Sequence, residues 1–152
     1  MFDSGADLEQ CQVVVTEQQI SVCFSVEQEP YQLLLMRSRI HPTAYLVLFG
    51  HKAHRDPLGK TGTGNAQRVY SVVMWLMRHM AHNPPSPHEI TCFYWSASGE
   101  SRQRLYQRLM LRVARDLNWH SSNDRQLFPG NVGDNEHTYT VMRDLHQINC
   151  KI

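Results

Sequence analysis

Apolar residues in the first third of the chain occur in short runs that polar turn sequences separate. The first run, 11–16, extends toward 20–26, and two more runs follow at 31–36 and 44–49. The intervening segments 27–30 and 41–43 each contain a proline among polar residues, which favours turns. This pattern predicts three strands joined as an antiparallel meander.

Two later segments have the helical period, in which apolar residues recur every three or four positions. The first spans about 65–82 and stops before 83–87, where successive prolines forbid its continuation. The second spans 100–118, with Ser98 as its expected cap and the acidic Glu100 in its first turn. Its apolar stripe consists of Leu105, Leu109, Val113 and Leu117, with Tyr106 and Met110 alongside.

Strand-like runs at 90–95 and 138–143 complete the pattern, and a polar loop at 121–136 precedes the last of them. The order of elements is therefore β-β-β-α-β-α-β. It predicts an α+β fold with a mixed, mostly antiparallel sheet flanked by two main helices. At 152 residues, the chain is expected to form one domain, 1–152, with residues 1–10 as a flexible N-terminal segment.

The charge of the chain is nearly balanced, at a formal net value of +1. There is therefore no global attraction to nucleic acid or to a membrane surface. The first residues lack the basic and apolar regions of a signal peptide, and no apolar run is long enough to cross a bilayer. We expect a soluble, cytoplasmic protein without a membrane partner.

Cysteines and histidines give no pattern typical of a metal site. The close pair His51 and His54 has no accompanying carboxylate ligands, so we expect no metal. The cysteines form no C-x-x-C pair, and we expect reduced, partly buried thiols. They are Cys11, Cys23, Cys92 and Cys150.

A glycine-rich segment, 58–64, lies between the strand at 44–49 and the helix that begins at Asn65. Glycines let a backbone approach a ligand closely, and the first amides of a helix attract anions, so this turn is a candidate phosphate or pyrophosphate site. The alternative is an ordinary loop. Lys60 and Thr61 match the end of a Walker A motif, but His54 occupies the position of its first glycine, which argues against a nucleoside triphosphatase.

The order of these elements and the glycine loop resemble the GCN5-related N-acetyltransferase (GNAT) superfamily over roughly residues 20–145. In that family the loop contains glutamine or arginine, two residues, glycine, one residue, and glycine or alanine, and its amides hold the pyrophosphate of coenzyme A. Gly62 and Gly64 match the last two positions. Gly59 replaces the glutamine or arginine, and Lys60 can supply the missing positive charge.

The resemblance implies an acetyl-CoA-dependent N-acyltransferase that acts on an amine of a small molecule or protein. The residues implied to bind the cofactor are Val47, Phe49, Lys60, Gly62, Thr63, Gly64 and Asn65. Tyr106 falls where the family often has a tyrosine that protonates the departing thiolate, although it can equally be a core aromatic residue. The general-base candidates are Glu27, Glu29, His51 and His54, among which the sequence does not choose; Glu29 joins Tyr106 as a catalytic candidate.

The second helix also carries a stripe of arginines on one face: Arg104, Arg108, Arg112 and Arg115. Like charges at this spacing repel, so the stripe is either solvated, paired with acids from elsewhere in the fold, or bound to a partner. The partners considered are an acidic protein, nucleic acid and the 3′-phosphate of coenzyme A. The alternative function is therefore a non-enzymatic interaction module that uses this face.

Overall fold

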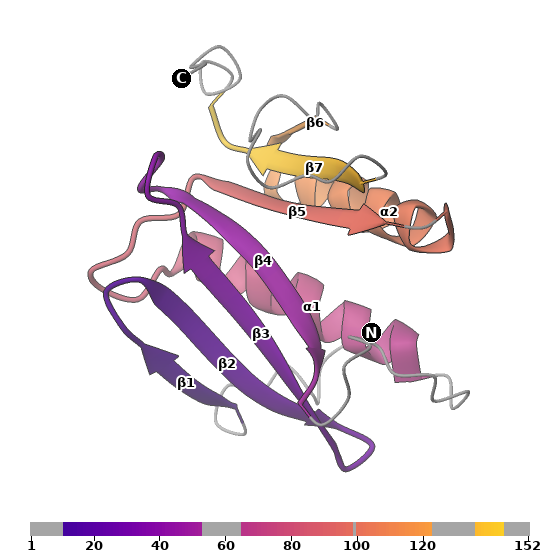
Figure 1. Ribbon diagram of the computed structural model, residues 1–152. Coiled ribbons are helices and arrows are strands. Elements are labelled where there is room, and N and C mark those ends of the chain that lie inside the picture. The colour runs from indigo at the N-terminus through magenta and orange to yellow at the C-terminus, as the bar shows by residue number, and fades with distance from the viewer. Residues whose placement is uncertain (1–10, 53–64, 99, 123–135, 145–152) are drawn as a thin grey trace.

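The chain forms one mixed β-sheet with two long helices in a computed structural model that describes residues 11–52, 65–98, 100–122 and 136–144. The sheet has seven strands in the order β1-β2-β3-β4-β5-β7-β6 (Figure 1). Neighbouring strands pair antiparallel, except that β4 and β5 run parallel. The α+β fold class is therefore confirmed. The elements are β1 (Gln12–Val15), β2 (Gln19–Val26), β3 (Glu29–Arg37), β4 (Ala44–His51), α1 (Asn65–His82), β5 (Cys92–Ser98), α2 (Glu100–Leu117), β6 (His120–Ser122) and β7 (Glu136–Met142).

The first predicted strand is in fact two strands, β1 and β2, joined by a turn at 16–19. The N–H of Thr16 donates to the carbonyl of Gln19 at 2.9 Å, and the Thr16 hydroxyl accepts from the N–H of Gln19 at 3.2 Å. This turn has no glycine or proline, so the apolar pattern did not reveal it. The short strand β6 lies where a polar loop was predicted, because its pairing with β7 does not require apolar residues. The observed order is β-β-β-β-α-β-α-β-β.

The hairpin between β2 and β3 has a two-residue turn. Glu27 and Gln28 have φ angles of 51° and 68°, and Val26 pairs with Glu29 on either side of them. Two successive residues with positive φ match the right-handed twist of paired strands. The sequence analysis placed residues 29 and 30 in this turn, whereas they begin β3.

Both helices lie where the sequence predicts them. The bounds of α1 are those predicted, and α2 ends at Leu117, one residue earlier than predicted. The N–H of Trp119 donates to the carbonyl of Ala114, and Asn118, at φ 59°, donates to Arg115, which together form a Schellman motif. The side chain of Ser98, the predicted cap, lies outside the described residues. No helix in the described part of the chain is both long and apolar enough to cross a membrane.

A buried histidine ties the segment before β5 to the sheet. The Tyr45 hydroxyl lies 2.6 Å from Nδ1 of His88, and Nε2 of His88 lies 2.6 Å from the carbonyl oxygen of Thr16. Because a carbonyl only accepts, Nε2 carries the proton and Nδ1 accepts from Tyr45. These two hydrogen bonds of His88 hold the start of β5 beside β4.

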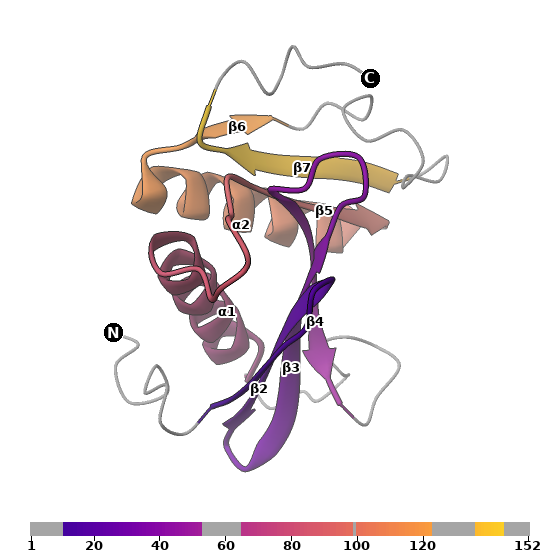
Figure 2. The same ribbon diagram turned by 90° about the vertical axis from the view of Figure 1, so that its left-hand side faces the viewer.

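The main core lies between one face of the sheet and both helices, which Figure 2 shows on the same side. Alternate residues of β2, β3 and β4 point into it, as a strand facing a core requires. A smaller cluster of Ala44, Cys92, Tyr94 and Met142 occupies the opposite face. The residues of α2 that enter the main core are Tyr106, Leu109, Met110, Val113, Ala114 and Leu117.

Candidate functional site

The parallel strands β4 and β5 part after a short stretch of pairing. They pair only from Ala44 and Cys92 to Leu46 and Tyr94, yet β4 continues to residue 51 and β5 to residue 98. Figure 1 shows the two strands diverging beyond this point. The pairing of β4 with β5 therefore ends near the centre of the sheet, and we call the region between the diverging ends of these strands the opening.

Hydrogen bonds at both ends of β4 show which way its main chain faces. The N–H of Lys52 donates to the carbonyl of Pro30, and the carbonyl of Ala44 accepts from the N–H of Ser38, so both residues face β3. Main-chain groups alternate in direction along a strand, so those of Val47 and Phe49 face the β5 side. Both residues lie beyond the last pair with β5. Their N–H and carbonyl groups are thus directed into the opening.

Three aromatic rings meet at the end of β4. The centroid of the Phe49 ring lies 5.5 Å from that of Tyr70 in α1 and 5.8 Å from that of Tyr106 in α2. The centroids of the two tyrosine rings are 6.4 Å apart. Tyr106 is buried, at 8% exposure. The structure thus brings Tyr106 beside the part of β4 that leaves β5; its catalytic role remains a prediction.

Two buried polar atoms, one in β5 and one in β3, have no hydrogen-bond partner among the described residues. They are Nε1 of Trp95, the first residue of β5 after the paired stretch, and the hydroxyl of Tyr31 in β3. Their residues are 1% and 0% exposed. Such atoms cost free energy unless water or a ligand satisfies them.

Two of the four general-base candidates form a pair. Nε2 of His51 lies 2.9 Å from Oε2 of Glu29, and the side chains are 3% and 52% exposed. The His51 ring also meets the edge of Tyr31 at 5.1 Å. Glu27 instead forms an ion pair with Arg68 of α1. The structure thus pairs Glu29 with His51 and Glu27 with Arg68, and the role of any of them as a general base remains a prediction; His54 lies outside the described residues.

The N-terminal end of α1 lies beside the end of β4. Arg68, in the first turns of α1, contacts the β2–β3 turn through Glu27, and Tyr70 contacts Phe49. The first turn of α1 itself contains no acidic residue. Asn65 is the first residue of α1. The predicted cofactor residues Lys60, Gly62, Thr63 and Gly64 lie outside the described residues.

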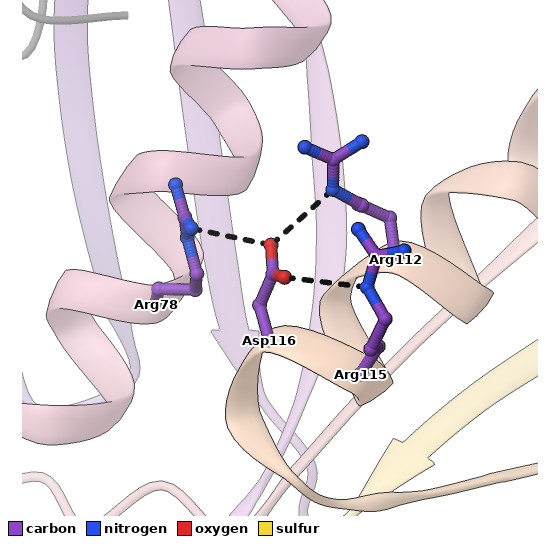
Figure 3. Close-up of polar contacts among 4 residues, drawn as sticks. All are labelled: Arg78, Arg112, Arg115 and Asp116. Carbon is purple, nitrogen blue, oxygen red and sulfur yellow. Dashed lines mark hydrogen bonds and ion pairs between the residues drawn. The ribbon is translucent and has the colours of Figure 1, made fainter. Parts of the chain in front are cut away.

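The arginine stripe is partly compensated by one carboxylate. Asp116 contacts Arg112 at 3.6 Å, Arg115 at 3.7 Å and Arg78 of α1 at 3.2 Å (Figure 3). Arg104 and Arg108 are exposed on the same helix. For Arg112 and Arg115, the described acid comes from α2 itself, and Arg78 of α1 contacts the same carboxylate.

Within the described residues, no three histidine, cysteine, aspartate or glutamate side chains gather to hold a metal ion. The thiols of Cys11 and Cys23 are half-buried, and that of Cys92 is buried. Burial raises the pKa of Cys92 to about 12, which leaves it protonated and unreactive. The chemistry of the site therefore depends on its aromatic, histidine, carboxylate and main-chain groups.

No family model matches the sequence, and no curated protein matches it. Among solved structures, the chain is similar to diaminobutyrate acetyltransferase EctA from Paenibacillus lautus in complex with L-2,4-diaminobutyric acid and coenzyme A (16% identity, TM-score 0.45, 83% of this chain and 70% of that chain). It is also similar to a protein from Desulfovibrio desulfuricans assigned to the GNAT family of acetyltransferases (12% identity, TM-score 0.44, 82% of this chain and 69% of that chain). A third similar structure is the ribosomal L7/L12 alpha-N-protein acetyltransferase RimL in an apo crystal form (14% identity, TM-score 0.40, 83% of this chain and 69% of that chain).

Sequence reasoning missed four residues of this region: Tyr70, Arg78, Trp95 and Asp116. Tyr70 carried a usable signal, because it falls on the apolar side of the predicted helix one turn after its start. The other three carried no such signal. Arg78 and Asp116 matter because they contact each other in the folded chain, and Trp95 matters because its Nε1 is buried there without a described partner. Arg78 and Asp116, for example, are 38 positions apart.

Proposed function

We propose that the protein is an acyl-CoA-dependent N-acyltransferase that acts on an amine of a small molecule or protein. The observation that carries this proposal is the parting of β4 from β5, which directs the main-chain groups of Val47 and Phe49 into the opening. An extended ligand with amide groups can pair with such a strand edge as a further strand would. The pantetheine arm of coenzyme A is extended and contains amides.

The position of α1 supports the same ligand. Its N-terminal end lies beside the end of β4, so an arm bound along Val47 and Phe49 would bring its diphosphate toward the first amides of the helix. In the proposal, Lys60, Gly62, Thr63, Gly64 and Asn65 form the turn that binds this diphosphate. The unpartnered Nε1 of Trp95 is a buried donor close to the same opening.

The cofactor supplies an acyl thioester, and transfer forms a nitrogen–carbon bond while the carbon–sulfur bond breaks. The amine must lose a proton and the thiolate must gain one. We assign the first task to the Glu29–His51 pair and the second to Tyr106. His51 follows Phe49 by two positions on the same face of β4, about 7 Å along the strand, and Phe49 contacts the Tyr106 ring. The two groups therefore flank one short stretch of β4.

Calorimetric titration with coenzyme A and with acetyl-CoA tests the proposal. We expect saturable binding that Gly62→Trp weakens at least about tenfold, because a large side chain there blocks the close approach of the main chain to the diphosphate. Lys60→Ala should also weaken binding. The matched control is Lys52→Ala, which removes an exposed lysine at the end of β4 and should leave binding within about twofold.

Release of free thiol from acetyl-CoA, measured with a panel of amines, tests the reaction itself. The panel should contain diamines, L-2,4-diaminobutyric acid and peptides with a free N-terminus. Acceleration by one class of amine would identify the acceptor. If coenzyme A produces no binding heat at millimolar concentration and no amine accelerates thiol release, the proposal is wrong.

A further inference from the structure

The cluster of arginines around Asp116 joins the two helices. Arg112 and Arg115 reach Asp116 along α2, and Arg78 reaches it from α1 (Figure 3). Asp116 is 20% exposed, whereas Arg112 and Arg115 are 56% and 69% exposed. One carboxylate thus faces three guanidinium groups, and the cluster has a charge of three minus one, or +2.

The geometry of the contacts leaves hydrogen-bond donors facing outward. Arg112 and Arg115 both contact Asp116 through Nε, and Figure 3 shows their terminal nitrogens beyond that atom, away from the carboxylate. Terminal guanidinium nitrogens form the fork that binds a carboxylate or phosphate through two parallel hydrogen bonds. Asp116 therefore holds the arginines in place without occupying these donors.

An exposed apolar side chain lies among these charges. Leu111 is 51% exposed, and the helical repeat places it beside Arg108, three positions before it, and Arg115, four positions after it. We name the residues Arg78, Arg108, Leu111, Arg112, Arg115 and Asp116 the arginine surface. It combines surplus positive charge with one exposed apolar side chain, Leu111, at the edge farther from Asp116.

We propose that the arginine surface docks an acidic segment of a partner protein, whose carboxylates meet the guanidinium groups while an apolar side chain covers Leu111. A protein segment fits better than nucleic acid because Leu111 offers no ring for base stacking. The tryptophans nearest in sequence to Arg78 and Asp116 already stack on other rings: Trp75 on His79, with ring centroids 5.0 Å apart, and Trp119 on Phe93, with centroids 5.9 Å apart.

This docking surface is independent of the proposed acyltransferase site. Tyr106 and Tyr70 meet in the N-terminal halves of the helices, whereas Asp116 and Arg78 meet in the C-terminal halves. Tyr106 and Asp116 are ten positions apart, about 15 Å along α2. Loss of docking therefore leaves coenzyme A binding intact, and the failure of one proposal does not imply the failure of the other.

Fluorescence anisotropy with a short labelled peptide of glutamate and leucine tests the proposal. Arg112→Glu combined with Arg115→Glu should weaken binding by about tenfold or more, because it replaces two attractive charges with repulsive ones. The matched control is Arg39→Glu combined with Arg143→Glu, which changes the net charge equally at exposed positions on other elements. The control should stay within about twofold of the parent protein.

Two further variants keep the test decisive. Arg108 forms no ion pair with any described residue, so Arg108→Glu leaves the contacts of Asp116 intact and should still weaken binding severalfold. Leu111→Ala should weaken binding of the glutamate–leucine peptide but not of a glutamate–glycine peptide. Equal losses in the control and the test variants would overturn the proposal, as would tighter binding of a single-stranded oligonucleotide that Leu111→Ala leaves unchanged.

Discussion

Nε2 of His51 lies 2.9 Å from the carboxylate of Glu29, so a nearly buried imidazole is linked to a carboxylate that is half exposed to solvent. The two residues are 22 positions apart, and the antiparallel pairing of β3 with β4 brings them together. An imidazole held in this way has its orientation and its tautomer fixed by the carboxylate. In the proposed mechanism the imidazole takes the proton of the amine, and Glu29 stabilises the charge that results.

Glu29→Gln should lower the turnover of acyl transfer by about 100-fold and leave coenzyme A affinity unchanged, because the amide keeps the shape but cannot stabilise a protonated His51. Steady-state kinetics combined with calorimetry would separate the two effects. Glu17→Gln, at an exposed position in the β1–β2 turn, is the control and should retain full turnover. Equal turnover in both variants would remove Glu29 from the mechanism.

Tyr106→Phe tests the second catalytic assignment. Phenylalanine keeps the ring contacts with Phe49 and Tyr70 but cannot donate a proton, so turnover should fall by about 10-fold to 100-fold without a change in coenzyme A affinity. Tyr70→Phe is the matched control within the same cluster and should retain turnover. Unchanged turnover in Tyr106→Phe, measured with a stable variant, would show that Tyr106 serves only the core.

Cysteine alkylation tests the arrangement of the sheet faces. Cys92 is 2% exposed and its pKa is raised to about 12 by burial, so iodoacetamide at pH 8 should modify Cys11 and Cys23 much faster. The experiment uses Cys150→Ser, so that only the three described thiols react, and mass spectrometry of peptides gives each rate. Denaturant should make the three rates similar. Modification of native Cys92 as fast as Cys11 would contradict the described packing.

The parts of the fold that depend on local pattern were predictable from the sequence. The period of the apolar residues predicted the observed bounds of α1, and it predicted an end of α2 one residue beyond the observed end. It could do so because one face of each helix enters the core. The split between β1 and β2 was not predictable, since hydrogen bonds of Thr16 and Gln19 define that turn. The bounds of the later strands also moved, to Cys92–Ser98 and Glu136–Met142, because partner strands extend them.

The site was predictable only as separate pieces. Alternation along the strand puts Val47 and Phe49 on one face, and the helical period puts Tyr106 on the core side of α2. Their assembly at one place depends on the sheet order and on where β4 leaves β5, which no local pattern encodes. The same holds for the pairing of Glu29 with His51 and of Glu27 with Arg68, because each joins residues of different elements.

Stability should fall at alkaline pH. Burial raises the pKa of Tyr45 and Tyr139 above the ordinary value of 10.0, and it raises the pKa of Cys92 from 9.0 to about 12. The unfolded chain therefore releases these protons first as pH rises, so the contribution of these three groups to the free energy of unfolding is constant below about pH 8 and declines above it. Urea unfolding at pH 8 and pH 10.5 measures the loss. Tyr139→Phe should reduce it, and an equal loss in that variant would contradict the assignment.

Gln28→Gly should stabilise the protein by about 1 kcal/mol, because Gln28 has a φ of 68° that glycine adopts without the steric cost of a side chain. The substitution leaves Glu27 and its ion pair with Arg68 in place. Gln18→Gly, in the β1–β2 turn, is the matched control. Gln18 is not among the residues with positive φ, so the same change there should destabilise the protein by about 0.5 kcal/mol through the added freedom of the unfolded chain. Urea unfolding of the two variants must give shifts of opposite sign; shifts of the same sign would refute the two-residue hairpin turn.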